Sequence, residues 1–235
     1  MKQYETEHYI FNYNTNSKAE SDISKIASLQ EACFLYICNV LRAKPTFKIE
    51  YFLCKTPDEV GRIYGDNEPC SGFADEPNKI YAVYNEKTQC IGFHEDAHIV
   101  SYTLNRPECS AVREGLAMYF DRKWWGIQNI DWTGFFIKSD RFIDVDKLLD
   151  EDAFFAESCS VTYPIMGAFT EWLISSYGID RYLEFYKYKN SIDALTKVYN
   201  RTPKELNKSF IDYVSIFKND ETLEGRMAEL LKSKK

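Results

Sequence analysis

The chain has 235 residues, of which 45% are hydrophobic and 16% aromatic, enough for a large core in one domain or two lobes. Its formal net charge is -7 and no basic stripe is present, so we expect no nucleic-acid partner. No apolar run approaches the length of a membrane span, and the N-terminus lacks the apolar core of a signal peptide. These features favour a cytoplasmic protein, or a secreted or anchored one if a leader has been removed.

The first part of the chain alternates strand and helix patterns. Strands are predicted from runs of aromatic and β-branched residues, and helices from apolar residues that recur with the helical period. Thr56 followed by Pro57 is typical of a helix N-cap and first turn. The predicted strands span residues 5–13, 47–54 and 79–84, and the predicted helices span residues 22–41 and a short segment that begins after Thr56.

After about residue 88 the strand signals disappear and helical patterns dominate. Ser110 is a possible cap for the helix that follows it, and the aromatic stretch 124–142 is either a short helix or a lid. Further helices are predicted over residues 162–177, 179–187, 192–199, 203–217 and 222–231, the first of them ended by Gly178. We therefore predict an α+β protein. Residues 1–87 form an N-terminal lobe with a mixed sheet and packing helices, residues 88–235 form a mostly helical lobe, and the active-site cleft lies between them.

The segment that begins this second part contains His94-Glu95-x-x-His98, the H-E-x-x-H pattern. Residues four apart on a helix lie on the same face, so His94 and His98 can offer ring nitrogens to one zinc ion. Glu95 projects from an adjacent position, from which it can reach a water molecule on that metal. The alternative is two surface histidines with no metal. The metal interpretation is favoured because the chain has only three histidines and two of them lie in the motif.

A catalytic zinc ion needs a third protein ligand and one open position for water. Glu114, in the next predicted helix, is the natural candidate for that ligand. Together these residues predict a site in which His94, His98 and Glu114 bind one Zn²⁺ ion and Glu95 is the general base.

The combination of H-E-x-x-H with the later segment Arg113-Glu-Gly-Leu-Ala-Met-Tyr-Phe120 resembles the gluzincin metallopeptidases. The resemblance is greatest to the compact, peptidase MA-like proteins related to the catalytic domains of thermolysin and the zinc aminopeptidases. It implies a zincin-like fold, peptide-bond hydrolysis, and a role for Glu114 as the third zinc ligand. The segment Thr162–Gly178 is similar to a helix that follows the zinc site in that family. By that match Tyr163 would donate its phenol to the oxyanion, although a packing role for Tyr163 is about equally favoured.

Two departures from the family pattern bear on specificity. Thermolysin-type enzymes use a histidine outside the motif, and the only one left here is His8, which is expected on a sheet face. The aminopeptidases carry a Gly-Ala-Met-Glu-Asn segment, which the corresponding residues 71–76 do not match. An edge strand could still bind an extended peptide by backbone pairing, with Phe73 and Ala74, or residues 79–84, as candidates.

We therefore expect a zinc-dependent hydrolase of the metallopeptidase class with a peptide or protein substrate. The alternative is a catalytically silent or latent zinc-binding module that holds a peptide or protein partner; hydrolysis of a non-peptide amide is a third possibility. Asp96 and Asp121 are candidates for hydrogen bonding to the ligand histidines, each with a solvated surface acid as the alternative.

Overall fold

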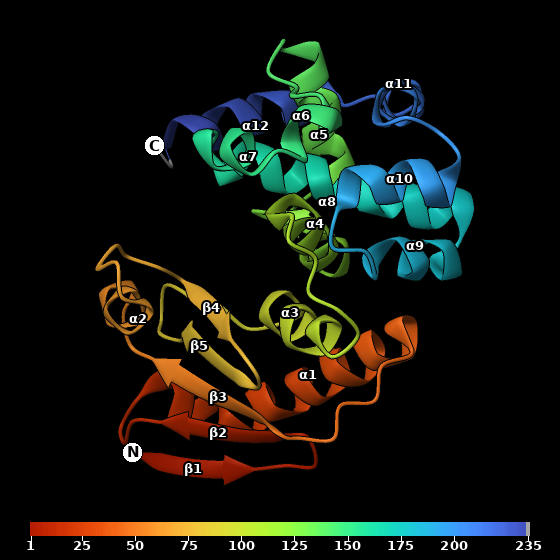
Figure 1. Ribbon diagram of the computed structural model, residues 1–235. Coiled ribbons are helices and arrows are strands. Elements are labelled where there is room, and N and C mark those ends of the chain that lie inside the picture. Colours follow the sequence, from red (N-terminus) through yellow and green to blue (C-terminus); the bar gives the residue numbers. More distant parts are fainter. Residues whose placement is uncertain (234–235) are drawn as a thin grey trace. The chain divides into compact units, whose positions relative to one another are not determined.

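The computed structural model describes residues 1–233, and the chain divides into two compact units, Met1–Leu104 and Asn105–Lys235. The sequence predicts a boundary between lobes after residue 87. The units divide later, because helix α3 (His94–Tyr102) packs in the first unit against α1 (Lys18–Leu41) and β4 (Gly72–Asp75). Both motif histidines therefore belong to the unit that contains the sheet. The α+β class and the mixed N-terminal sheet are confirmed (Figure 1), whereas the zincin-like fold and its cleft stay predictions.

The sheet of the first unit has five strands in the order β1-β2-β3-β5-β4. Its three inner strands are parallel, and the two outer strands, β1 and β4, are antiparallel to their neighbours. The predicted single strand over residues 5–13 is wrong, because a turn at residues 6–8 separates β1 from β2. Of the two candidates for an edge, the segment with Phe73 and Ala74 is correct, and residues 79–84 lie inside the sheet. The strands are β1 (Lys2–Glu5), β2 (Tyr9–Tyr13), β3 (Ile49–Cys54), β4 (Gly72–Asp75) and β5 (Lys79–Val83).

One face of this sheet is apolar and buried. Tyr9, Phe11 and Tyr13 alternate along β2, and the side chains that share their face on β3 and β5 are also buried. α1 is the long amphipathic helix that the sequence predicts, and Ser17 caps its N-terminus. On the opposite face, α2 (Pro57–Tyr64) buries Val60 against β3 and β5. Thr56 is its N-cap, as predicted.

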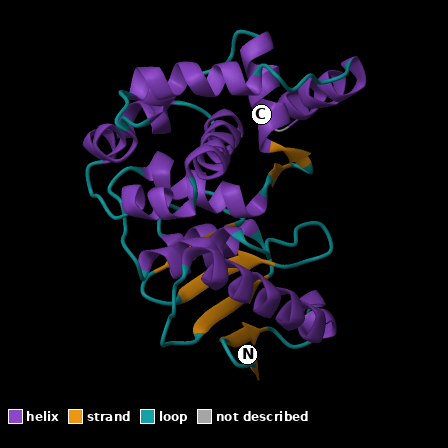
Figure 2. Ribbon diagram, turned by 90° about the vertical axis from the view of Figure 1, so that its right-hand side faces the viewer, coloured by secondary structure: helices purple, strands orange, loops and turns teal. Residues whose placement is uncertain are grey.

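The second unit consists of helices and one short hairpin, formed by β6 (Lys123–Trp124) and β7 (Ile127–Gln128) (Figure 2). The sequence predicts no strand in this part of the chain. The aromatic stretch 124–142 contains most of this hairpin and the helix α5 (Asn129–Lys138). No helix in the described part of the chain is long and apolar enough to cross a membrane. The helices are α4 (Ser110–Asp121), α5 (Asn129–Lys138), α6 (Val145–Leu148), α7 (Glu151–Ala156), α8 (Cys159–Tyr177), α9 (Ile179–Tyr186), α10 (Ser191–Tyr199), α11 (Pro203–Val214) and α12 (Glu221–Ser233).

The centre of the second unit is the contact between α4 and α8, and it depends on two glycines. A Cβ atom on Gly115 of α4 would lie 2.7 Å from Thr170 Oγ1 and 3.0 Å from the Met166 carbonyl oxygen. A Cβ atom on Gly167 of α8 would lie 2.7 Å from Met118 Cβ. Real Cβ atoms essentially never approach other heavy atoms to 2.7 Å, so glycine at both positions lets the two helices lie this close together.

Candidate metal centre

The two motif histidines begin the site, and both lie on α3. His94 is the first residue of the helix and His98 follows one turn later. Their ring centroids are 5.1 Å apart and the ring planes are inclined at 80°. His98 is buried and His94 is partly buried. The helical spacing in the sequence therefore brings the two imidazoles together, as predicted.

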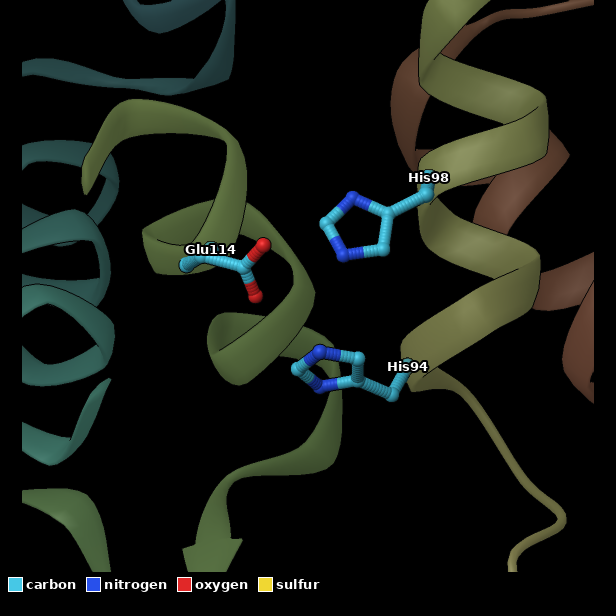
Figure 3. Close-up of side chains that lie close together, drawn as sticks. All are labelled: His94, His98 and Glu114. Carbon is cyan, nitrogen blue, oxygen red and sulfur yellow. The ribbon is translucent and has the colours of Figure 1, made fainter. Parts of the chain in front are cut away.

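Glu114, on α4, completes the predicted set of ligands. One ligand atom from each of His94, His98 and Glu114 lies within 4.8 Å of the other two (Figure 3). In the close-up, both imidazole rings and the carboxylate are directed toward one another. All three side chains are at least partly buried. Among the histidines, cysteines and acidic residues of the described part of the chain, these three form the group that could hold a metal ion.

The chemistry of this donor set can be compared with the preferences of metal ions. Two imidazole nitrogens and one carboxylate oxygen form a set found in catalytic zinc sites. Zinc binds such atoms at about 2.0–2.2 Å in tetrahedral geometry, which places pairs of ligand atoms roughly 3.3 Å apart. The ligand atoms of His94, His98 and Glu114 all lie within 4.8 Å of one another. The three residues therefore fit zinc in type and in number.

A buried polar network holds the face of α3 that lies opposite the histidines. Its centre is Asp96, which is fully buried. Tyr9 of β2 and the Gln30 side-chain amide of α1 both bond to Asp96 Oδ2, the latter at 2.9 Å. The Gln30 side chain also accepts from the Gly92 amide at 2.8 Å and donates to the Gly92 carbonyl at 3.0 Å. Gly92 has φ of 131°, which favours glycine at this entry to the helix.

The hydrogen bonds of Asp96 fall on one of its two oxygens. Asp96 Oδ2 accepts from the Tyr9 hydroxyl and from the Gln30 side-chain amide, and the Tyr9 oxygen also lies 3.1 Å from the Gln30 carbonyl oxygen. Burial raises the pKa of Asp96 well above its ordinary value. Because this side chain is buried and bonds to Tyr9 and Gln30, the prediction that Asp96 bonds to a ligand histidine or is a solvated surface acid is wrong.

Glu95 lies beside the edge strand of the sheet. A Cβ atom on Gly72, the first residue of β4, would lie 3.4 Å from Glu95 Oε1 and 3.1 Å from Cys90 Sγ. β4 is the last strand in the order of the sheet. The predicted general base is thus next to the backbone of the strand to which an extended chain could pair.

One contact at the histidines was not predicted from the sequence. The Tyr102 hydroxyl oxygen lies 3.3 Å from His98 Nδ1, and the ring centroids of the two residues are 5.6 Å apart. Tyr102 follows His98 by four positions on α3, so the spacing that pairs His94 with His98 could also have indicated this contact.

Tyr163 lies in the first half of α8, and its ring packs between two aromatic side chains. Its centroid is 6.0 Å from that of Phe154, with nearly parallel planes, and 5.8 Å from that of Trp124. These contacts agree with the packing alternative for Tyr163. Its assignment as an oxyanion donor stays a prediction.

The N-terminus of α4, one turn before Glu114, is held by side chains. Glu151 of α7 accepts a hydrogen bond from the Ser110 amide at 2.9 Å and another from the Ser110 hydroxyl. Arg113 donates to the Pro107 and Glu108 carbonyls, each at 2.6 Å. The N-cap residue is Cys109, and Ser110 is already inside the helix, so the prediction of Ser110 as the cap is wrong. The carboxylate of Glu151 takes that role from another helix.

His8, the third histidine, is bound elsewhere in the first unit. It lies in the turn between β1 and β2, where its Nδ1 is 2.6 Å from Glu31 Oε2 and its ring stacks on Phe34 at 4.3 Å. The expectation that it occupies a sheet face is therefore wrong. Its contacts tie the turn to α1.

Comparison of the chain with protein-family models, with curated proteins and with solved structures found no significant match.

Proposed function

We propose that this protein is a zinc-dependent metallopeptidase of gluzincin type. The observation that supports this most directly is the group of His94, His98 and Glu114, whose ligand atoms lie within 4.8 Å of one another. Glu95 follows the first of these residues in the sequence and supplies the carboxylate that acts as general base in such hydrolysis. Two histidines and a glutamate leave a fourth position for water in a tetrahedral site.

A zinc ion held by these residues would lower the pKa of water and polarise a carbonyl group. Glu95 then accepts a proton from the attacking water and transfers it to the leaving amine, which is the work of a general base that becomes a general acid. The raised pKa of Asp96, caused mainly by burial, suits this role of Glu95, because an ionised carboxylate next to it in the sequence would repel the negative charge on Glu95. In this proposal Tyr163 either donates to the developing oxyanion or only packs between Phe154 and Trp124.

The edge strand β4 supports a peptide as the substrate. An extended peptide can pair with the backbone of an edge strand and so present its bonds in a fixed register. Because Gly72 of β4 lies against Glu95, a chain paired with this strand would pass close to the general base. A non-peptide amide would lack this repeated backbone pairing.

The substitution Glu95→Gln tests the proposal. It removes the base and keeps the size of the side chain, so we expect zinc content to stay at one ion per chain and hydrolysis of a peptide library to fall by about 10²- to 10⁴-fold. Zinc is measured by elemental analysis and turnover by mass spectrometry. Glu50→Gln is the matched control, because Glu50 lies on the sheet face turned away from α1, and it should keep full activity.

The alternative function has its own outcome in the same experiment. A protein that binds zinc and has no turnover with any peptide, in the wild type as in Glu95→Gln, would be a silent or latent module that holds a peptide or protein partner. Equal turnover in the wild type and the variant would overturn the role assigned to Glu95.

A further inference from the structure

We propose that Tyr102 is a positioning residue for the metal: its hydroxyl binds His98 Nδ1 and thereby presents His98 Nε2 to the ion. This inference rests on the metal site of the proposed function and adds a residue that the H-E-x-x-H pattern does not contain. The observation that supports it is the distance of 3.3 Å between the Tyr102 hydroxyl oxygen and His98 Nδ1.

The two ring nitrogens of a histidine have different roles when one of them binds a metal. The nitrogen that binds must be unprotonated, so the other carries the hydrogen and needs an acceptor. At His98 the Nδ1 atom lies next to the phenol oxygen of Tyr102, which can accept that hydrogen. Nε2 is therefore the nitrogen left to bind metal. A ligand histidine whose other nitrogen is held in this way keeps one tautomer and one ring orientation.

Asp96, the acidic residue nearest to His98 in the sequence, does not make this contact with His98 Nδ1. Asp96 is the acid that follows Glu95 in the motif, and it points into the buried network with Tyr9 and Gln30. The phenol differs from a carboxylate in being neutral. It therefore fixes the direction of the His98 ring without adding a negative charge close to the metal, and less electron density is pushed onto the ligand nitrogen.

Two features of Tyr102 make it suitable for this role. It lies four residues after His98 on the same helix, so the contact is set by helical geometry and needs no other segment of the chain. Its ring also lies along the imidazole, with planes inclined at 33°, which restricts the rotation of both side chains. The hydroxyl and the ring can be separated experimentally, because phenylalanine keeps the ring.

The test compares the zinc affinity of Tyr102→Phe with that of the wild type by competition with a chromophoric chelator. We expect the affinity to fall about tenfold, and by no more than about a hundredfold, which is the range for loss of a hydrogen bond to a ligand histidine. Tyr84→Phe is the matched control. It removes a hydroxyl that bonds to Asp22 at 2.9 Å in the same unit and should leave zinc affinity unchanged.

A second measurement separates positioning from packing. In the zinc-loaded wild type, ¹⁵N NMR of the imidazoles should show His98 bound through Nε2, with a hydrogen on Nδ1 that exchanges slowly with water. In Tyr102→Phe this hydrogen should exchange faster, although the ring contact is kept. Coordination through Nδ1, or equal affinities of the wild type and Tyr102→Phe, would overturn the inference.

The outcomes for the two proposals can be told apart. A wild type that binds zinc, loses affinity in Tyr102→Phe and hydrolyses no peptide would support the role of Tyr102 and overturn the peptidase. A wild type that hydrolyses peptides but has the same zinc affinity as Tyr102→Phe would support the peptidase and overturn the role of Tyr102. A wild type that binds no zinc would overturn both.

Discussion

Helices α3 and α4 carry the candidate metal ligands, yet they are fixed by different kinds of contact. α3 presents two histidines and is held by buried hydrogen bonds from Asp96 to Tyr9 and Gln30. α4 presents one glutamate and is held by close contact with α8, where Gly115 allows the backbones to approach. α3 is thus positioned by buried polar groups that need hydrogen-bond partners, and α4 by the close packing that a glycine allows.

The difference predicts opposite sensitivities to substitution. Removal of atoms from the polar network leaves buried donors without acceptors, which costs about 1–3 kcal/mol for each unsatisfied group. Addition of atoms to the tight helix contact forces backbones apart and costs a similar amount through strain. The two helices should therefore be destabilised by changes of opposite kind, and each change should act mainly on its own unit.

The largest effect is expected for Asp96→Ala. The change removes the hydrogen-bonding partner shared by Tyr9 and Gln30 and leaves a gap beneath α3, so we expect a loss of about 2–3 kcal/mol. The measurement is native-state hydrogen exchange at the amides of α3 in metal-free protein, because zinc would add its own stabilisation.

Asp96→Asn is the control for this prediction. The amide has nearly the same size and keeps an oxygen that can accept from Tyr9 and Gln30, so the expected loss is about 1 kcal/mol or less. A loss as large as that of Asp96→Ala would mean that the network requires the carboxylate itself, and the expectation that an uncharged acceptor can replace it would be wrong.

Gly115→Ala should have the next largest effect. The new Cβ atom would meet Thr170 Oγ1 and the Met166 carbonyl oxygen, and the expected loss is about 1–2 kcal/mol, because strain exceeds the gain in helix propensity. The change in the free energy of unfolding is measured by chemical denaturation, followed with a probe in the second unit. Gly225→Ala in α12 is the matched control, since its Cβ atom would meet no heavy atom within 4 Å. It should stabilise the protein by roughly 0.5–1 kcal/mol.

The same contrast explains which features could be predicted from the sequence. The pairing of His94 with His98 follows from helical periodicity alone, and so do the bounds of most helices to within a few residues. Glu114 is predicted from the zinc chemistry and from the family resemblance, and one of its carboxylate oxygens lies within 4.8 Å of a ring nitrogen of each histidine. These predictions depend on local geometry or on a known chemical requirement.

The contacts that fix the site depend on segments far apart in the chain, and periodicity does not reveal them. Asp96 is a charged residue type in a polar motif, so burial against Tyr9, 87 positions earlier, had no local signal. The role of Gly115 likewise depends on Thr170 of another helix. Glu151 was missed for the same reason, since a cap supplied by a different helix leaves no pattern next to Ser110.

The smallest of these effects is expected for Glu151→Ala, which removes the polar contact at the start of α4. The Ser110 amide and hydroxyl would lose their acceptor, and Arg113 would lose a carboxylate 3.9 Å away. The side chain of Glu151 is nearly half exposed, so water can replace part of what is lost, and we expect about 0.5–1 kcal/mol. Hydrogen exchange should show the change at the first-turn amides of α4 and leave the amides near Gly115 unaffected. Glu151→Gln keeps one acceptor oxygen and should lose less. An effect that extends along the whole of α4 would mean that the cap, and not the contact with α8, determines where this helix lies.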